Sequence, residues 1–425
     1  MTSKINSSCQ FPIAKPEDVG FSRKRLSRIE PGLQKYIDGG KVPNLVTLVA
    51  RHGKIVHFTS QGYMDLDSKR PAKRDAVYRL YSNSKPIAGV ATLILYEEGK
   101  LNLDDQVSKY IPEFTNPMII TPGTLIQEQT VMPTRRGITI RDCLRNTTGL
   151  ATPWRSPTTM YFQYQKIIAE SGWNLLDTLD EPPRISYRER VTAHGRLPLS
   201  FEPGKDFEYH VGYPIIGVLI EQITGKTLEE FYQERIFKPL GMKDTSFYLD
   251  KNKLEKFTTC YRAMRRQHEW KLEIYDRPET SEKFKGPQKY FAPGGDMGGV
   301  LSTVSDYARL AQMLLNGGDL DGVRILSRKT VELMTSSHTG NLLIPMLGHG
   351  YGFGLGVGVR TTGNWQPMMR SIGAYGWGGA AGTTYFADPK EDLFAICFTQ
   401  VLNHALMPDN NYQEEFEKLV YQSLE

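Results

Sequence analysis

A serine and a lysine stand three residues apart at Ser82 and Lys85, and this pair is the strongest chemical signal in the chain. Residues i and i+3 of a helix share a face, with β-carbons about 5–6 Å apart, so the hydroxyl and the amine can meet without help from the rest of the fold. A serine beside a lysine is one way to activate a nucleophile without histidine. If burial favours the neutral amine, Lys85 can serve as the base that removes the Ser82 proton.

The same spacing also fits an ordinary helix N-terminus with a solvated lysine. A Ser-x-x-Lys sequence is expected about once by chance in a chain of this length. Two observations favour the chemical interpretation. No other Ser-x-x-Lys occurs in the chain, and Lys85 opens an apolar segment, flanked by Tyr81 and Pro86, that is an unusual place for a solvated amine. The apolar run predicts a helix over 86–98 that ends at Gly99.

The elements that must position this pair come from both ends of the chain. Apolar residues at helical spacing near the N-terminus precede a predicted hairpin, and a second hairpin near the C-terminus precedes an amphipathic helix. The predicted strands cover 46–50, 55–58, 351–359, 383–387 and 393–398, and the closing helix includes 412–420. The predicted fold class is therefore α+β, with an antiparallel sheet from both chain ends, flanking helices and an inserted, mainly helical domain.

We expect residues 1–80 and 293–425 to form one discontinuous α/β sheet domain, and residues 81–292 to form a helical domain with long loops. The active site is expected between the two. Long loops inside a compact protein are usually functional rims or lids. The predicted loops are 112–137, 150–190 and 255–292, and the further predicted helices are 139–147, 212–224, 227–238, 303–316 and 327–335.

Composition excludes several classes of protein. The chain is 40% hydrophobic and 23% charged, as in ordinary globular proteins, and its net charge of +5 is scattered, so we expect no nucleic-acid partner. No segment has the length of a membrane span or of a signal-peptide core, so no membrane association and a cytoplasmic location are expected. Cys9, Cys143, Cys260 and Cys397 are far apart and have no metal-ligand spacing, so free thiols, no metal and no cofactor are expected.

Further segments follow the Ser-x-x-Lys in a fixed order. With these segments taken together, the chain resembles the serine β-lactamase and penicillin-binding-protein superfamily, in its class C-like branch. The resemblance covers nearly the whole chain, and it implies a β-lactamase-like fold. The segments that carry it are Ser82 to Lys85, 98–105, 138–150, 202–213, 239–242, 294–303 and the C-terminal strands.

Two departures from the family pattern concern substrate choice. The second motif, usually Tyr-x-Asn, is Tyr209-His210-Val211 here, so the amide side chain is lost. In the segment 376–383, which takes the place of the third motif, Trp377 replaces the usual cation and supplies an apolar wall. A literal His338-Thr339-Gly340 stands before the glycine-rich strand, in the wrong place for this motif. These departures resemble the family VIII carboxylesterases and related acyltransferases.

The resemblance implies a role for each matching residue. Ser82 would form the acyl-enzyme, Lys85 would act as base, and Tyr209 would be a partner base or acid that passes the proton to the leaving alcohol. The backbone N–H groups of Ser82 and Ala380 would hold the oxyanion, and two glycines would let that strand approach closely. The predicted oxyanion-hole and substrate-binding residues are Ser82, Ala380, Trp377, Gly378 and Gly379.

We therefore expect a serine carboxylesterase that acts on small-molecule esters of small to medium acyl chains, with weak or no β-lactamase activity. Three alternatives stay open: an acyltransferase that uses an alcohol acceptor, a β-lactamase or D-peptidase, and a non-catalytic binding or assembly protein of the same fold. An α/β-hydrolase is not indicated, because the chain has no Gly-x-Ser-x-Gly. The sequence leaves the physiological substrate and the oligomeric state open.

Overall fold

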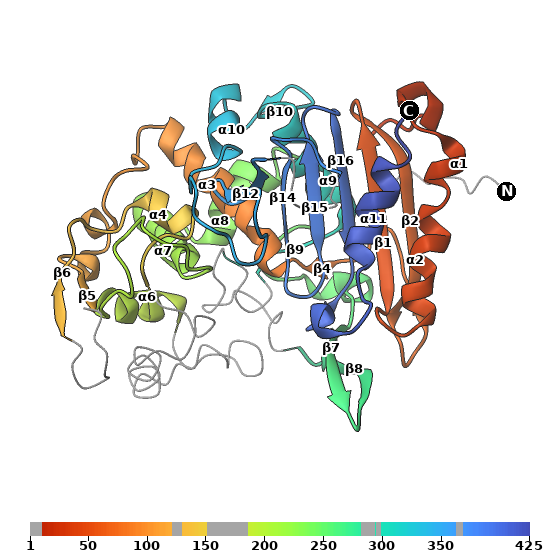
Figure 1. Ribbon diagram of the computed structural model, residues 1–425, viewed down its shortest axis with the longest axis horizontal. Helices are drawn as coiled ribbons and strands as arrows, with labels where there is room; N and C mark the ends of the chain where they lie inside the picture. The colour runs from red at the N-terminus through yellow and green to blue at the C-terminus, as the bar shows by residue number, and fades with distance from the viewer. Residues whose placement is uncertain (1–10, 121–129, 151–185, 282–293, 295–298, 363–368) are drawn as a thin grey trace.

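An antiparallel sheet of eight strands, drawn from both ends of the sequence, dominates one half of the molecule (Figure 1). The computed structural model describes residues 11–120, 130–150, 186–281, 294, 299–362 and 369–425. In spatial order the strands are β12 (Tyr351–Phe353), β13 (Gly358–Arg360), β14 (Tyr375–Gly378), β15 (Thr384–Asp388), β16 (Leu393–Phe398), β1 (Asn44–Arg51), β2 (Lys54–Asp65) and β3 (Arg70–Pro71).

The two hairpins predicted from the sequence meet in the middle of this sheet. β1 pairs with β16 in a register that sets Val46 opposite Phe398 and Leu48 opposite Ile396. The predicted α+β architecture, with a sheet from both chain ends, is confirmed. Whether the chain divides into domains at 80 and 293 stays a prediction.

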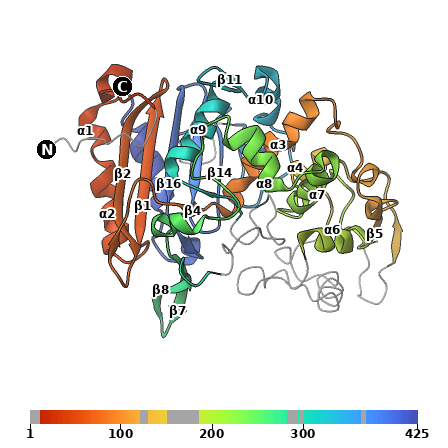
Figure 2. The same ribbon diagram turned by 180° about the vertical axis from the view of Figure 1, so that it is seen from behind.

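Each face of the sheet is covered by helices, which explains why the central strand β16 is apolar throughout. Every residue of β16 is buried. Phe394 and Ile396 belong to the large core shared with α3 (Lys85–Glu97), whereas Ala395 packs in a second core with α2 (Ile29–Asp38). Helix α11 (Tyr412–Tyr421) lies in front of the sheet in Figure 1, and α9 (Val304–Leu315) lies in front of it in the opposite view of Figure 2, so the two helices cover opposite faces.

A cluster of helices beside the sheet carries the first part of the site. The central helix α3 has no exposed residue from Lys85 to Leu95, so it is enclosed on all sides. The other helices near α3 are α4 (Ile140–Leu144), α6 (Tyr187–Gly195), α7 (Gly212–Thr224), α8 (Leu228–Tyr232) and α10 (Arg328–Met334), whereas α1 (Arg23–Leu26) packs near α11. The helices predicted at 86–98, 139–147, 212–224, 227–238, 303–316 and 327–335 all occur, with shorter ends in most cases.

Short strands complete the described part of the chain. The pairs are β4 (Tyr78–Arg79) with β9 (Leu301–Ser302), β5 (Met118–Ile120) with β6 (Val131–Pro133), and β10 (Asp319–Leu320) with β11 (Val323–Arg324). A fourth small sheet has three strands in the order β17 (Val401–Leu402), β7 (Cys260–Arg266), β8 (Glu269–Asp276). No helix among the described residues is both long and apolar enough to cross a bilayer.

Four predictions of local structure were wrong. The segment 112–137 was predicted as a loop, but it contains the paired strands β5 and β6. The segment 255–292 was predicted as a loop, but its residues 260–276 form the projecting β7–β8 hairpin (Figure 1). Helix α6 begins inside the loop predicted at 150–190, most of which lies outside the described residues. The strand predicted at 351–359 is interrupted between Phe353 and Gly358, where the backbone of Gly356 has a φ of 108° and packs against the Lys85 carbonyl. A β-carbon on Gly356 would lie 2.7 Å from that oxygen, so only glycine fits this approach.

Candidate active site

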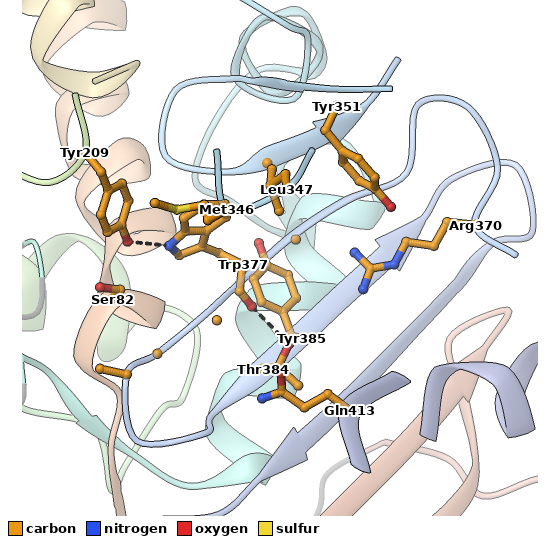
Figure 3. A pocket seen from close by; sticks show the side chains of 15 residues that line it. Ser82, Tyr209, Met346, Leu347, Tyr351, Arg370, Trp377, Thr384, Tyr385 and Gln413 are labelled. Atoms are coloured by element: carbon orange, nitrogen blue, oxygen red, sulfur yellow. Dashed lines mark hydrogen bonds between the residues drawn. The ribbon is translucent and has the colours of Figure 1, made fainter. Parts of the chain in front are cut away.

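Ser82 lies in a short turn, Tyr81–Ser84, that leads directly into helix α3. The Leu80 carbonyl just before the turn accepts a hydrogen bond from the Thr383 hydroxyl at 2.9 Å, which ties the turn to the sheet. Tyr81 has a φ of 49°, an uncommon backbone conformation for a bulky residue that its surroundings must hold. Ser82 is partly exposed and lines a cavity of about 370 Å³ (Figure 3).

Lys85 is completely buried, and its amine reaches the serine as the spacing predicts. The distance from Lys85 Nζ to Ser82 Oγ is 3.0 Å, and the distance to the Gly294 carbonyl oxygen is 2.5 Å. The amine also lies over two aromatic rings, 4.5 Å from the ring centroid of Tyr209 and 5.0 Å from that of Tyr213. A serine hydroxyl and an amine held in contact, with water largely excluded from the amine, can exchange a proton.

Tyr209 stands in the loop before α7, with its ring beneath the amine and its hydroxyl directed to the sheet (Figure 3). Its hydroxyl accepts a hydrogen bond from the Trp377 indole N–H at 2.9 Å. The Trp377 ring also meets Phe353 edge to face, with centroids 4.8 Å apart. Trp377 therefore supplies the apolar wall that the sequence suggests, and in addition a polar contact to Tyr209 that sequence reasoning missed.

The chain after strand β14 passes close to the Tyr81–Ser84 turn at Gly379. A β-carbon on Gly379 would lie 2.1 Å from the Leu80 carbonyl oxygen, so any side chain there would push the strand away. At Gly378 the nearest atom would be 3.3 Å away, so the predicted close approach belongs to Gly379 alone. The Gly379 N–H donates to the Thr383 carbonyl at 2.7 Å, whereas Ala380 is exposed on the cavity wall.

His210 is the neighbour of the amine that sequence reasoning missed. Its Nδ1 lies 3.1 Å from Lys85 Nζ. The residue has a φ of 92°, and its backbone N–H donates to the Asn146 side-chain oxygen at 2.9 Å. The second-motif position His210 was visible in the sequence, but no spacing or periodicity connects it to a lysine 125 residues earlier.

Two other positions behave as the sequence suggests. Val211 is buried in the large apolar core and offers no polar side chain to the site. His338 lies between α10 and β12, where its Nε2 is 2.8 Å from the Leu333 carbonyl and its backbone carbonyl accepts from Arg145. Burial lowers the pKa of His338. The His-Thr-Gly sequence therefore lies away from the third-motif position.

The cavity continues from Ser82 along β14 toward helix α11. A second cavity of about 300 Å³ shares several lining residues with the first, among them Tyr351, Arg370 and Gln413 (Figure 3). Arg370 forms an ion pair with Glu417 of α11 at 2.6 Å. The described residues contain no group of three or more metal-ligating side chains.

Comparison with known proteins places this geometry in a family. A family model described as Beta-lactamase matches residues 29–416. Esterase EstB of Burkholderia gladioli is 25% identical over 387 residues, which cover 88% of this chain and 90% of that protein. Protein Rv1367c of Mycobacterium tuberculosis is 29% identical over 380 residues, which cover 87% of this chain and 89% of that protein.

Solved structures show the same fold. The hydrolase EstCE1, described as having promiscuous acyltransferase activity, superposes with a TM-score of 0.76 at 25% identity, covering 94% of this chain and 99% of that chain. Simvastatin synthase of Aspergillus terreus superposes with a TM-score of 0.76 at 21% identity, covering 94% and 98%. With a family model that matches almost its whole length and a β-lactamase-like fold, the chain belongs to the beta-lactamase family of serine hydrolases.

Proposed function

We propose that this protein is a serine carboxylesterase that cleaves esters of small to medium acyl chains through an acyl-enzyme on Ser82. The observation that carries the proposal is the contact of 3.0 Å between Ser82 Oγ and the buried Lys85 Nζ, beside an open cavity. Burial disfavours the ammonium form of a lysine, and a neutral amine at this distance is a competent base.

The reaction proceeds in two stages. Lys85 takes the Ser82 proton as Oγ attacks the ester carbonyl, and the exposed backbone at Ala380, with Ser82 itself, faces the developing oxyanion. The proton then passes to the leaving alkoxide with the help of Tyr209, the ester C–O bond breaks, and the alcohol departs. Water attacks the acyl-enzyme by the same proton path in reverse.

The side chains around Ser82 favour esters over lactams and peptides as substrates. Trp377 is apolar and buried where a cation would hold a substrate carboxylate, and Val211 lies in the core. An amide nitrogen must be protonated as it leaves, whereas an alkoxide needs little help. The similarity to EstB, an esterase by description, supports ester cleavage.

Acyl transfer to an alcohol is the second candidate, and the cavity beyond Ser82 favours it. The two adjoining cavities of about 370 and 300 Å³ leave space for an acceptor beside the acyl group. EstCE1 is described as having acyltransferase activity as well as being a hydrolase. Product analysis with and without a primary alcohol separates the two: transfer gives a new ester in place of the free acid.

The proposed nucleophile is tested by Ser82→Ala. Because Ser82 faces the cavity and contributes little packing, the variant should fold normally and lose cleavage of p-nitrophenyl butyrate. Intact mass spectrometry after a brief reaction should show one added acyl group on the wild type and none on the variant. Lys85→Ala should lose about 10²–10⁴-fold in kcat, as expected for a general base. An active Ser82→Ala enzyme would remove the proposal.

Substrate preference gives an independent test. We expect kcat/KM for p-nitrophenyl butyrate to exceed that for ampicillin by far more than tenfold. The absent carboxylate anchor alone is worth roughly 1.5–3 kcal/mol, or about 10–150-fold in binding. Equal values for the two substrates would show that Trp377 does not set this preference. Trp377→Lys, which restores a cation, should raise kcat/KM for ampicillin and so reduce the difference between the two substrates.

A further inference from the structure

Three polar atoms of the described residues lie within hydrogen-bond distance of the Lys85 amine, and their chemistry constrains its protons. Nζ lies 3.0 Å from Ser82 Oγ, 2.5 Å from the Gly294 carbonyl and 3.1 Å from His210 Nδ1. A carbonyl can only accept, whereas a hydroxyl can donate or accept and a neutral imidazole nitrogen accepts when its proton is on the other nitrogen. A neutral amine has two N–H groups and one lone pair, so two acceptors and one donor complete its needs.

We propose that His210 is a positioning residue for Lys85: its neutral imidazole accepts one N–H on Nδ1 and thereby turns the amine lone pair toward Ser82. This inference rests on the proposed function. With Gly294 and His210 as acceptors, the remaining direction on Nζ faces Oγ. During attack the O–H bond of Ser82 breaks as a third N–H bond forms on Lys85. That proton later forms the O–H bond of the departing alcohol as the ester C–O bond breaks.

The backbone at His210 is arranged to hold this contact. A φ of 92° is uncommon for residues with a side chain, and it persists here with the His210 N–H donating at 2.9 Å to the side chain of Asn146. Asn146 is itself fully buried, so this support is shielded from water. A position that favours glycine for backbone reasons holds a histidine instead, and the imidazole points to the amine.

Several titratable groups surround this pair in the described part of the chain. Tyr213 of α7 and Cys143 of α4 are completely buried, which raises the pKa of each well above its usual range and keeps both neutral. Tyr209, with ring centroids 5.9 Å from those of His210, and the buried Glu208 belong to the same loop. Two positive charges 3.1 Å apart would repel, which disfavours charging both side chains at once.

The inference is tested with pH profiles of kcat/KM for p-nitrophenyl butyrate in three variants. His210→Asn keeps an acceptor on a residue that tolerates positive φ, and should retain most of the wild-type kcat. His210→Gly removes the acceptor without backbone strain, and should lose about 10–100-fold in kcat with little change in KM.

The acid limb of each profile reports how the ammonium is stabilised. Loss of the acceptor destabilises the ammonium form of Lys85 more than the neutral amine. His210→Gly should therefore move the acid limb to lower pH by roughly half to one unit. His210→Asp places a negative charge beside Nζ and should move the limb to higher pH by about one unit or more. His210→Asn should leave the limb near its wild-type position.

His268→Gly is the matched control, because His268 also has a positive φ of 76° but is exposed at the tip of the β7–β8 hairpin. It should leave the whole profile unchanged. If His210→Gly fails to fold, the shift of the acid limb to higher pH in His210→Asp, against its wild-type position in His210→Asn, still decides. Coincident acid limbs in the variants would overturn the role of His210 while leaving Ser82 acylation intact. An inactive wild type would instead overturn the proposed function.

Discussion

Trp377 donates a hydrogen bond to Tyr209. Trp377 departs from the family's pattern, whereas Tyr209 keeps the tyrosine of its second motif. Because the indole N–H donates to the phenol oxygen at 2.9 Å, it orients the hydroxyl proposed to carry the proton. Tyr209 also covers the buried amine with its ring face, so it supports a developing ammonium charge. Tryptophan at position 377 therefore contacts the proposed proton path and also shapes the cavity.

A double-mutant cycle tests this link. Tyr209→Phe should lose about 10²–10⁴-fold in kcat through loss of the acid–base group. Trp377→Phe keeps an aromatic wall but removes the N–H, and should cost about 2–10-fold, the worth of one neutral hydrogen bond. In the Tyr209→Phe background the Trp377→Phe change should have no further effect, because the acceptor oxygen is gone. Additive losses in the double variant would mean that Trp377 acts by another route.

Single residues also mark how far the sequence can predict the site. Ser82 and Lys85 are neighbours on one turn, so their contact follows from local geometry. Tyr209 is indicated only by resemblance to a family, because no local pattern sets it apart from a core tyrosine. His210 could not be placed, since its contact depends on a loop conformation with positive φ that the fold imposes.

At the scale of elements, the site depends on how closely strand β14 approaches the Tyr81–Ser84 turn. The Gly379 backbone lies so near the Leu80 carbonyl that no side chain fits, and the Thr383 hydroxyl bonds the same carbonyl. The Tyr81–Ser84 turn and the end of strand β14 are thus in direct contact. Glycine at 379 is what permits this contact.

The contact predicts a difference between two adjacent glycines. Gly379→Ala should displace the strand end, lowering the free energy of unfolding by roughly 1–3 kcal/mol and reducing kcat/KM at least tenfold, as expected for overpacking at a site. Gly378→Ala meets its nearest atom at 3.3 Å and should lower the melting temperature much less. Thermal denaturation and ester hydrolysis of both variants provide the measurement. Equal melting temperatures would contradict the close approach.

Elements with strong periodicity were predictable, and those fixed by tertiary contacts were not. Helix α7 begins and ends where the apolar pattern predicts, because its core face is continuous. The β7–β8 hairpin was missed although residues 269–274 alternate between charged and apolar side chains with the two-residue period of a strand. Strand β7 lacks that alternation, and pairing of Tyr261 with Val401 across the chain helps to fix it. The break after Phe353 depends on a helix carbonyl that the local sequence cannot reveal.

On the scale of the whole molecule, the buried His57 and the half-buried His404 connect stability to pH. Burial lowers the pKa of His57 to about 3 and that of His404 to about 4. Both stay neutral in the folded protein, while in the unfolded chain a histidine binds a proton below about 6.5. The unfolded state therefore gains protons as the pH falls, and stability declines from about pH 6.5 toward pH 4 by up to about 1.4 kcal/mol per pH unit for each histidine.

Urea denaturation at pH 7 and at pH 5 checks this expectation. His57→Gln, which keeps a hydrogen-bonding group near the Thr47 hydroxyl that His57 Nε2 contacts at 2.8 Å, should reduce the loss of stability between the two pH values. His268→Gln, at an exposed position, should leave that loss unchanged. An identical pH dependence in all three proteins would show that other groups govern the acid sensitivity.

The pairing of β1 with β16 has a consequence for how the protein is made. The N-terminal hairpin emerges early from the ribosome, but its partner strand Leu393–Phe398 is synthesised about 340 residues later. During that interval one edge of β1 carries unpaired backbone groups and a row of apolar side chains, a surface prone to join other chains. The nascent protein should therefore depend on holding factors during translation, and premature release before β16 should yield aggregates instead of a smaller folded unit.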